Sequence, residues 1–282
     1  PYAMMAVTPA NGFSFQHGFY QSSELAPYTF PNAWVKLVRE GRVVTGYASA
    51  NGETWTQVGT TALSTTEPIE VGLFITSHDG SVVGTTTIDS VTLNATAANP
   101  LPAEWNHLDI GAPKLPGNAI YNASTEQFTL DAAGNDIWAD TDQFHYAYQE
   151  LSGDGSITAQ VISQSNTNDW AKAGVMIKDS ATAMSPYAMM AVTPVNGYTF
   201  QHGFNQSSEL APVTLPNAWV RLTKVGNVVT GYVSSNGADW TQLSSAVLNT
   251  STPKTIGLFN TSHNGNIVGR VVFENVVVEQ TP

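Results

Sequence analysis

The sequence predicts an all-β protein made of two-sheet antiparallel β-sandwiches of the jelly-roll type. Short stretches that alternate apolar and polar residues recur along the chain, and Gly, Asn and Pro turn signals separate them about every 8 to 12 residues. No stretch has a convincing helical period. Charged residues make up only 11% of the chain, less than half the usual share of about 25%, so Asn, Thr, Ser, Gln and Gly must supply most of the polar surface.

A long internal repeat organises the chain. When Pro1–Leu93 is laid over Pro186–Val278 without gaps, roughly 55 of 93 positions are identical. The stretch from about Pro102 to Ser185 occurs only once. It could complete a fold with the repeat before it or with the repeat after it. If it belongs with the second, the chain starts in the middle of a fold, and the first repeat needs a partner.

Alternation and turn residues predict the strands of each repeat in order. Gly41-Arg42 is the expected turn of the central hairpin in the first repeat. In the second repeat, Gly226-Asn227 and Asn236-Gly237 tolerate a positive φ and suit two-residue turns. In the first repeat we expect strands at Pro1–Val7, Gly12–Phe19, Trp34–Val38, Val43–Ser49, Ile69–Thr76 and Gly84–Leu93. The residues from Asn94 to Ala103 have no periodicity and contain two prolines, which indicates a linker.

The unique stretch is also predicted to form strands. The candidates are Gln127–Leu130, Phe144–Gln149, Ser156–Ser163 and Ala173–Lys178. Side chains alternate between the two faces of a strand, so Phe144, Tyr146 and Tyr148 share one face, and we expect that face to lie in the core.

Charge and composition exclude several classes of function. A formal net charge of −12 with only ten Lys and Arg leaves no basic stripe for phosphates, so we expect no nucleic acid partner and no anionic membrane partner. No apolar run is long enough for a membrane helix, so no membrane insertion is expected. The chain has no cysteine, so neither a disulfide framework nor a thiol site is possible.

The acidic and histidine residues form no recognisable catalytic motif. Asp136, Asp140 and Asp142 lie close together in a turn-like stretch, where they could be turn residues, a structural calcium site or a catalytic carboxylate pair. No histidine pair has metal-ligand spacing. His78 and His263 occupy the same repeated turn, and we expect them to cap backbone groups rather than contact a ligand.

The central hairpin of the second repeat gives the best candidate for a binding surface. With Gly226-Asn227 as its turn, Trp219 lies opposite Ser234, Arg221 opposite Tyr232, and Thr223 opposite Thr230. These six residues share one face, while Val220, Leu222, Val229 and Val233 share the core face. An aromatic plane, a guanidinium group and hydroxyls can stack on a sugar and hydrogen-bond to it.

The first repeat keeps this surface with Trp34, Lys36 and Tyr47. The same residues could instead be a cross-strand aromatic and cation pair that stabilises a solvent-facing sheet. Gln201 and His202 could extend either arrangement, although alternation places them on opposite faces of their strand.

Several motifs in one order carry a family resemblance. The run GNDIWADTDQFHYAYQELSGDGSITAQV is followed by DWAKAGVMIKDS, PYAMMAVTP, YVSSNGADWTQL and GLFNTSHNG. This series resembles bacterial secreted tandem domains of the concanavalin A-like lectin/glucanase superfamily. The resemblance implies a two-sheet jelly roll and, as candidate activities, carbohydrate binding or hydrolysis. The Glu-x-Asp-x-Glu strand of the glucanase members is absent, so we expect no enzyme and no catalytic residue.

The resemblance also implies the order of the domains. We expect the C-terminal half of one sandwich at residues 1–94, a linker at 95–102 and a complete sandwich at 103–282. The expected function is a structural or adhesive repeat segment of a larger extracellular bacterial protein. Carbohydrate binding is the alternative, and glycoside hydrolysis is the third possibility. The expected partners are neighbouring copies of the domain or chain, and glycans; no cofactor is expected beyond the possible calcium.

Overall fold

The computed structural model of the protein describes residues 2–25, 28, 30–63, 69–94, 100–210, 213–248 and 254–281. The regular secondary structure in these ranges consists of β-strands. They therefore include no helix long and apolar enough to cross a membrane.

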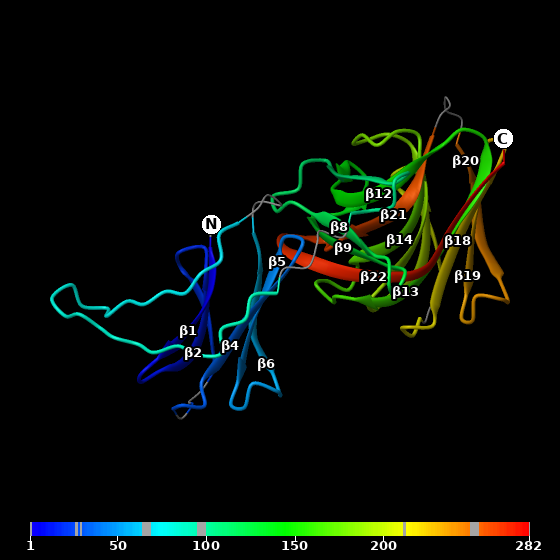
Figure 1. The fold of residues 1–282 in the computed structure, drawn as a ribbon. Helices are drawn as coiled ribbons and strands as arrows, with labels where there is room; N and C mark the ends of the chain where they lie inside the picture. The colour runs from blue at the N-terminus through cyan, green and yellow to red at the C-terminus, as the bar shows by residue number, and fades with distance from the viewer. Residues whose placement is uncertain are drawn as a thin grey trace.

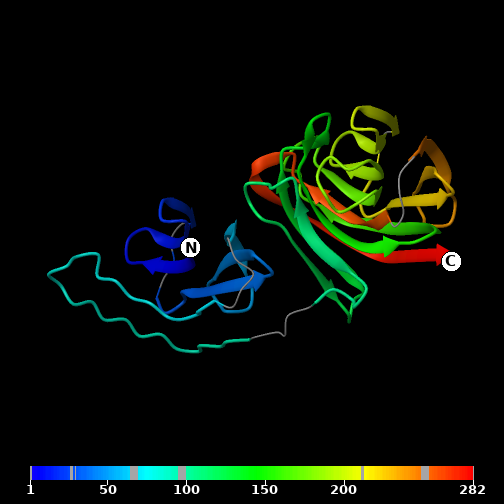
Figure 2. The same ribbon diagram turned by 90° about the horizontal axis from the view of Figure 1, so that it is seen from above.

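Two antiparallel sheets of seven strands pack against each other in the larger part of the protein (Figure 1, Figure 2). We call them the β14 sheet and the β13 sheet. The β14 sheet has the order β17 (Gln206–Leu210), β16 (Gly197–His202), β15 (Tyr187–Thr193), β14 (Lys172–Lys178), β21 (Lys254–Thr261), β12 (Phe144–Leu151) and β7 (Asn106–Ile110). The β13 sheet has the order β20 (Thr241–Val247), β19 (Val228–Ser234), β18 (Ala218–Val225), β13 (Asp154–Gln164), β22 (Asn264–Thr281), β9 (Gln127–Gly134) and β8 (Asn118–Asn122).

The first repeat forms two small sheets of three strands. One consists of β1 (Ala3–Thr8), β2 (Gly12–His17) and β3 (Gln21–Leu25), and the other of β4 (Trp34–Glu40), β5 (Val43–Ser49) and β6 (Thr56–Ala62). They pack through a small core that includes Met5, Phe13, Phe15 and Ala48. A short hairpin of β10 (Ile137–Trp138) and β11 (Thr141–Asp142) completes the strands of the described residues.

The predicted all-β, two-sheet antiparallel sandwich is confirmed by the β14 and β13 sheets. Every strand candidate of the unique stretch is a strand, as β9, β12, β13 and β14. The Gly41-Arg42 turn joins β4 and β5 as expected, with Glu40 paired to Val43. The fold that the superfamily resemblance implies is therefore the fold observed.

Two predicted strands of the first repeat are wrong. Ile69–Thr76 and Gly84–Leu93 contain no strand and are exposed throughout. In Figure 1 they form the long cyan arm that extends away from the β-sheets. Their alternation is genuine, and the residues in the same places of the second repeat form β21 and β22.

The physical reason is the absence of neighbouring strands. β21 lies between β14 and β12, and β22 lies between β13 and β9. All four of these flanking strands come from the unique stretch. Backbone N–H and C=O groups need partners to form a ladder, and in the described part of the first repeat nothing supplies them.

A second expectation needs correction. Phe144 and Tyr146 are fully buried and Tyr148 is partly buried, but they do not face the core between the sheets. They lie on the outer face of the β14 sheet, in a second apolar cluster with Met176 and Met189. Both faces of this sheet are therefore apolar, and alternation alone could not tell which face points toward the other sheet.

The strand ends differ slightly from those expected. β1 begins at Ala3, and Pro1 lies outside the described residues. β2 ends at His17, so Phe19 is not on the strand face with Phe13 and Phe15; it has φ +69° and is 72% exposed. Residues 95–99 of the expected linker also lie outside the described residues.

The tip of the β4–β5 hairpin contacts the edge of the β13 sheet. Glu40 forms an ion pair with Arg270 of β22. Gly41 lies so close to Asn118 of β8 that a Cβ atom there would meet the amide nitrogen at 1.9 Å. This turn therefore requires glycine for its positive φ and for the close approach.

Candidate functional site

The β18–β19 hairpin has the register that the sequence predicts. Trp219 pairs with Ser234, Arg221 with Tyr232 and Thr223 with Thr230. The other face carries the four residues expected in the core, and each is at most 4% exposed: Val220, Leu222, Val229 and Val233. The six polar and aromatic residues therefore lie on the outer face of the β13 sheet, away from the core.

Arg221 is held in place by two contacts. Its guanidinium carbon lies 3.9 Å from the ring centroid of Trp240. Its Nε donates a hydrogen bond to Thr158 Oγ1 on β13 at 2.9 Å. The planar cation is thus stacked on an aromatic ring and oriented by a neighbouring strand, which lowers the conformational entropy that binding would cost.

Trp240 is the residue of this surface that sequence reasoning missed. It follows the Asn236-Gly237 turn, where Asn236 Oδ1 accepts hydrogen bonds from Ala238 N and Asp239 N, each at 2.9 Å. That turn folds Trp240 back toward the hairpin. The available signal was the repeat itself, because Trp55 stands at the same place after Asn51-Gly52.

The first repeat has the same geometry with a lysine. The Lys36 ammonium lies 4.2 Å from the ring centroid of Trp55 and 5.0 Å from that of Tyr47. Trp34 lies against Gly52, just as Trp219 lies against Gly237. We call the residues Trp219, Arg221, Tyr232 and Trp240, and their counterparts Trp34, Lys36, Tyr47 and Trp55, the tryptophan surfaces.

Gln201 and His202 do not extend this surface. Both belong to β16 in the β14 sheet, whereas the tryptophan surface of the second repeat is on the β13 sheet. Gln201 is 3% exposed, and its Oε1 has no hydrogen-bond partner. The suggestion that they extend the surface was therefore wrong, because strand alternation carries no information about which sheet a strand joins.

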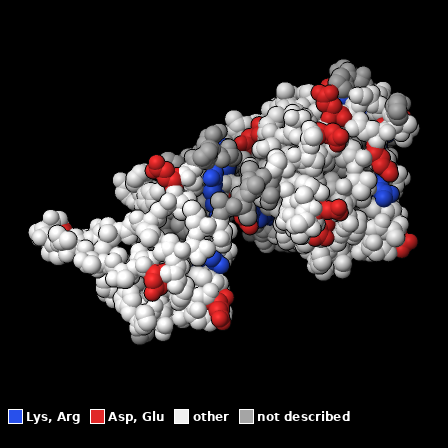
Figure 3. All heavy atoms as spheres, in the orientation of Figure 1, with Lys and Arg blue, Asp and Glu red and all other residues white. Residues whose placement is uncertain are grey.

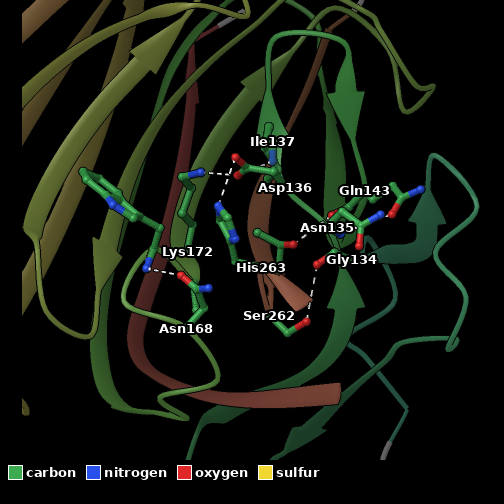
Figure 4. A network of polar contacts seen from close by, with 12 residues as sticks. Gly134, Asn135, Asp136, Ile137, Gln143, Asn168, Lys172, Ser262 and His263 are labelled. Carbon is green, nitrogen blue, oxygen red and sulfur yellow. Dashed lines mark hydrogen bonds and ion pairs between the residues drawn. The ribbon is translucent and has the colours of Figure 1, made fainter. Parts of the chain in front are cut away.

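A second polar network ties three turns together at one end of the β14 sheet (Figure 4). Asp136, just after β9, accepts a hydrogen bond from Lys172 at the start of β14. Asp136 also lies 3.2 Å from Nε2 of His263, in the β21–β22 turn. Burial lowers the pKa of Lys172, and the Asp136 carboxylate partly offsets that effect.

His263 does not cap its own turn, so that expectation was wrong. The backbone of the turn is instead satisfied by Ser262, whose Oγ accepts from Asn264 N at 3.2 Å and donates to Asn264 O at 2.7 Å. The imidazole is thereby left to reach across to Asp136. In the exposed turn at His78, the backbone N–H of His78 donates to Thr76 Oγ1 at 3.3 Å.

The three acidic residues of the predicted cluster have different contacts. Asp142 lies 3.0 Å from the Lys178 ammonium and also accepts from Met184 N at 2.7 Å. Asp136 is paired with Lys172, and Asp140 is exposed. Among the described residues, no group of three or more His, Asp or Glu is arranged to hold a metal ion.

The network therefore has the character of a structural link. The buried Asp142 lies beside Lys178, and the partly exposed Asp136 lies beside Lys172. Asp136–Lys172 and Asp142–Lys178 connect the β9–β12 segment to β14.

Comparisons with known proteins give only distant likenesses. No family profile and no curated protein matches the chain. A crystal structure of a functionally unknown Saccharomyces cerevisiae protein has 17% identity and a TM-score of 0.49, over 64% of this chain and 98% of that one. An alginate lyase of polysaccharide lyase family 7 has 11% identity and a TM-score of 0.44, over 62% of this chain and 93% of that one.

A plant lectin is similar at the same level. Lectin I from Ulex europaeus, in complex with the methyl glycoside of α-L-fucose, has 10% identity and a TM-score of 0.40, over 64% of this chain and 93% of that one. Such low identities and TM-scores say nothing about ligands or chemistry, since one fold serves many functions. Function must be argued from the residues themselves.

Proposed function

We propose that the chain is a non-enzymatic, carbohydrate-binding part of an extracellular, bacterial-type protein with tandem β-sandwiches. One observation carries the proposal: both repeats place a cation over a tryptophan on the outer face of the same hairpin, at 3.9 Å for Arg221 and 4.2 Å for Lys36. The two repeats differ at many other positions, yet both keep this arrangement.

The chemistry of the tryptophan surface suits a sugar. Aromatic planes stack on the apolar faces of pyranose rings, while guanidinium and hydroxyl groups hydrogen-bond to the ring substituents. Arg221 is pre-oriented by Trp240 and Thr158. Trp219, Arg221 and Tyr232 are all partly exposed on the outer face of the sheet, where a polysaccharide chain could reach them.

The experiment is a glycan array with the intact protein, followed by titration calorimetry on the best ligand. Trp219→Ala and Trp34→Ala should each weaken binding, by about tenfold if one aromatic stacking contact of roughly 1 to 1.5 kcal/mol is lost. The double variant should abolish it. Val195→Ala is the control, because Val195 is exposed in the turn between β15 and β16 of the other sheet.

The absence of binding by the intact protein to any glycan would overturn the proposal. Binding that survives the double tryptophan change would also overturn it, because the ligand would then lie elsewhere. Circular dichroism of each variant shows whether the hairpin is still folded.

A second candidate function is a structural or adhesive segment of an extracellular assembly. The specific observation is the apolar stretch from Ile69 to Leu93, which is exposed although its counterparts in the second repeat are central strands. Monomeric proteins rarely expose such an apolar surface without a binding partner. The sedimentation behaviour of the protein over a range of concentrations tests this role, since a concentration-independent monomer would contradict it.

A further inference from the structure

The unique stretch could in principle pair with either repeat, because the apolar contacts are nearly the same. Leu258 and Phe259 of β21 correspond to Leu73 and Phe74 of the first repeat. Strand β15 corresponds to an identical sequence in β1. The hydrophobic surface that residues 103–185 cover in the second repeat is therefore also present in the first.

Buried charges distinguish the two repeats. Arg270 of β22 donates to both oxygens of Asp131 on β9, through Nε at 2.8 Å and through Nη2 at 3.0 Å. Asp131 is 3% exposed. The position of Arg270 in the first repeat is Thr85, which cannot neutralise a buried carboxylate.

A second ion pair also distinguishes the two repeats. Lys254, 1% exposed at the start of β21, lies 3.2 Å from Asp179, which follows β14. Its counterpart in the first repeat is Ile69. Paired with the first repeat, Asp179 would lose this ammonium group.

A buried amide adds a third difference. Asn260 Nδ2 donates to Leu130 O at 3.0 Å and to Gly269 O at 2.8 Å. The corresponding residue is Ile75, which has no donor. At these three positions the second repeat is polar and matched to residues 103–185, while the first repeat is uncharged and unmatched.

We infer that Arg270 and Lys254 make residues 103–185 specific for the second repeat, and that the first repeat takes a segment with the same strand pattern but uncharged at the positions of Asp131 and Asp179. The attraction between the repeats and this stretch is hydrophobic and shared. The discrimination comes from a penalty, since mispairing would bury Asp131 without a cation. This inference concerns partner choice and does not depend on glycan binding.

Cysteine pairs test it in the full chain, which has no cysteine of its own. Ser156 lies opposite Glu279 in the β13–β22 pair, and both side chains reach the surface. The counterpart of Glu279 is Asn94. A chain with Ser156→Cys and Glu279→Cys reports pairing with the second repeat, and one with Ser156→Cys and Asn94→Cys reports pairing with the first, within one chain or between two.

Each cysteine pair is placed in the natural background and in one with Asp131→Asn, Asp179→Asn, Lys254→Ile and Arg270→Thr, which removes the discrimination. In the natural background we expect disulfide formation only with Cys at position 279. In the neutral background the disulfide to position 94 should rise about 100-fold or more relative to the natural one, because a buried unpaired acid no longer opposes it.

Equal crosslinking of both pairs in the natural background would overturn the inference. So would a neutral variant that folds, as judged by near-ultraviolet circular dichroism, and still crosslinks only to position 279. If that variant fails to fold, the single Thr85→Arg change decides instead: it supplies the missing cation and should raise the disulfide to position 94, and no rise would contradict the inference.

Discussion

The two repeats share most of their sequence but differ in how deeply their strands are buried. All seven residues of β15 are buried, whereas in β1 only Met5 is. All eight residues of β21 are buried, whereas Ile69–Thr76 is exposed and forms no strand. The comparison teaches that these segments carry the pattern of strands, but neighbouring strands decide whether the pattern becomes a sheet.

The surface shows the same contrast. In Figure 3 the face in view carries few charged residues, and the arm formed by residues 69–94 has Glu70, Asp79 and Asp89 as its only charged side chains. Val71, Leu73 and Leu93 are all more than 60% exposed, while Leu258 of the second repeat is fully buried. With so few charges to replace apolar contacts, burial in this protein depends on the partner strands.

The largest expected effect comes from removing Arg270. Arg270→Thr makes β22 like the first repeat at this position and leaves Asp131 buried without its cation, which should lower the free energy of unfolding by about 4 kcal/mol in urea denaturation. Thr85→Arg is the matched control. Thr85 is exposed, so that change should have little effect on stability.

The pH dependence of Arg270→Thr sharpens this prediction. Burial already raises the pKa of Asp131, although Arg270 opposes the shift, and without Arg270 the rise is larger. A raised pKa in the folded state means that the stability contribution is present at low pH and is lost as the pH rises through that pKa. The variant should therefore regain stability between pH 7 and pH 4. The Arg270→Thr, Asp131→Asn double variant should lack that recovery, and an equal recovery in both would contradict the assignment.

The next effect compares two methionines at the same place in the repeats. Met189 is fully buried in the outer cluster of the β14 sheet, and Met4 is only partly buried. Met189→Ala should cost about 3 kcal/mol of unfolding free energy, as expected for a buried methionine. Met4→Ala should cost less, about 1 to 2 kcal/mol, because part of the Met4 side chain is already exposed to water.

Hydrogen exchange of the strands that flank β15 and β1 shows which repeat loses stability in each variant. Similar losses for Met189→Ala and Met4→Ala would mean that β1 is covered on its outer face in solution. That result would break the comparison between a complete and an incomplete sandwich.

The smallest effect concerns the two hairpin turns. Gly41 and Gly226 have φ +59° and +58°, so alanine is strained at both, by roughly 1 kcal/mol. Gly226 has nothing within 4 Å of an added Cβ, whereas at Gly41 that atom would meet Asn118. Gly41→Ala should therefore cost about 1 kcal/mol more in urea denaturation. Adding Asn118→Ala should reduce the difference, and its persistence would show that the hairpin tip does not rest on β8.

Local chemistry made part of the candidate site predictable. The Gly226-Asn227 turn and strand alternation set the register that places Arg221 beside Tyr232. The stacking of Arg221 on Trp240 was not predictable in the same way, because Trp240 lies outside the hairpin, after a separate turn and just before β20. The pairing of Asp136 with Lys172 also joins residues far apart in sequence, and nothing local indicates it.

The sequence by itself determined the repeat, the alternating segments and the registers of the central hairpins, because alternation and turn residues act over a few neighbouring positions. Only the tertiary structure decided which faces are covered. It put Tyr146 on the outer face of its sheet, joined His263 to Asp136, and left Ile69–Thr76 without a ladder. These outcomes depend on contacts between distant segments, and the same residues behave differently when those segments are present or absent.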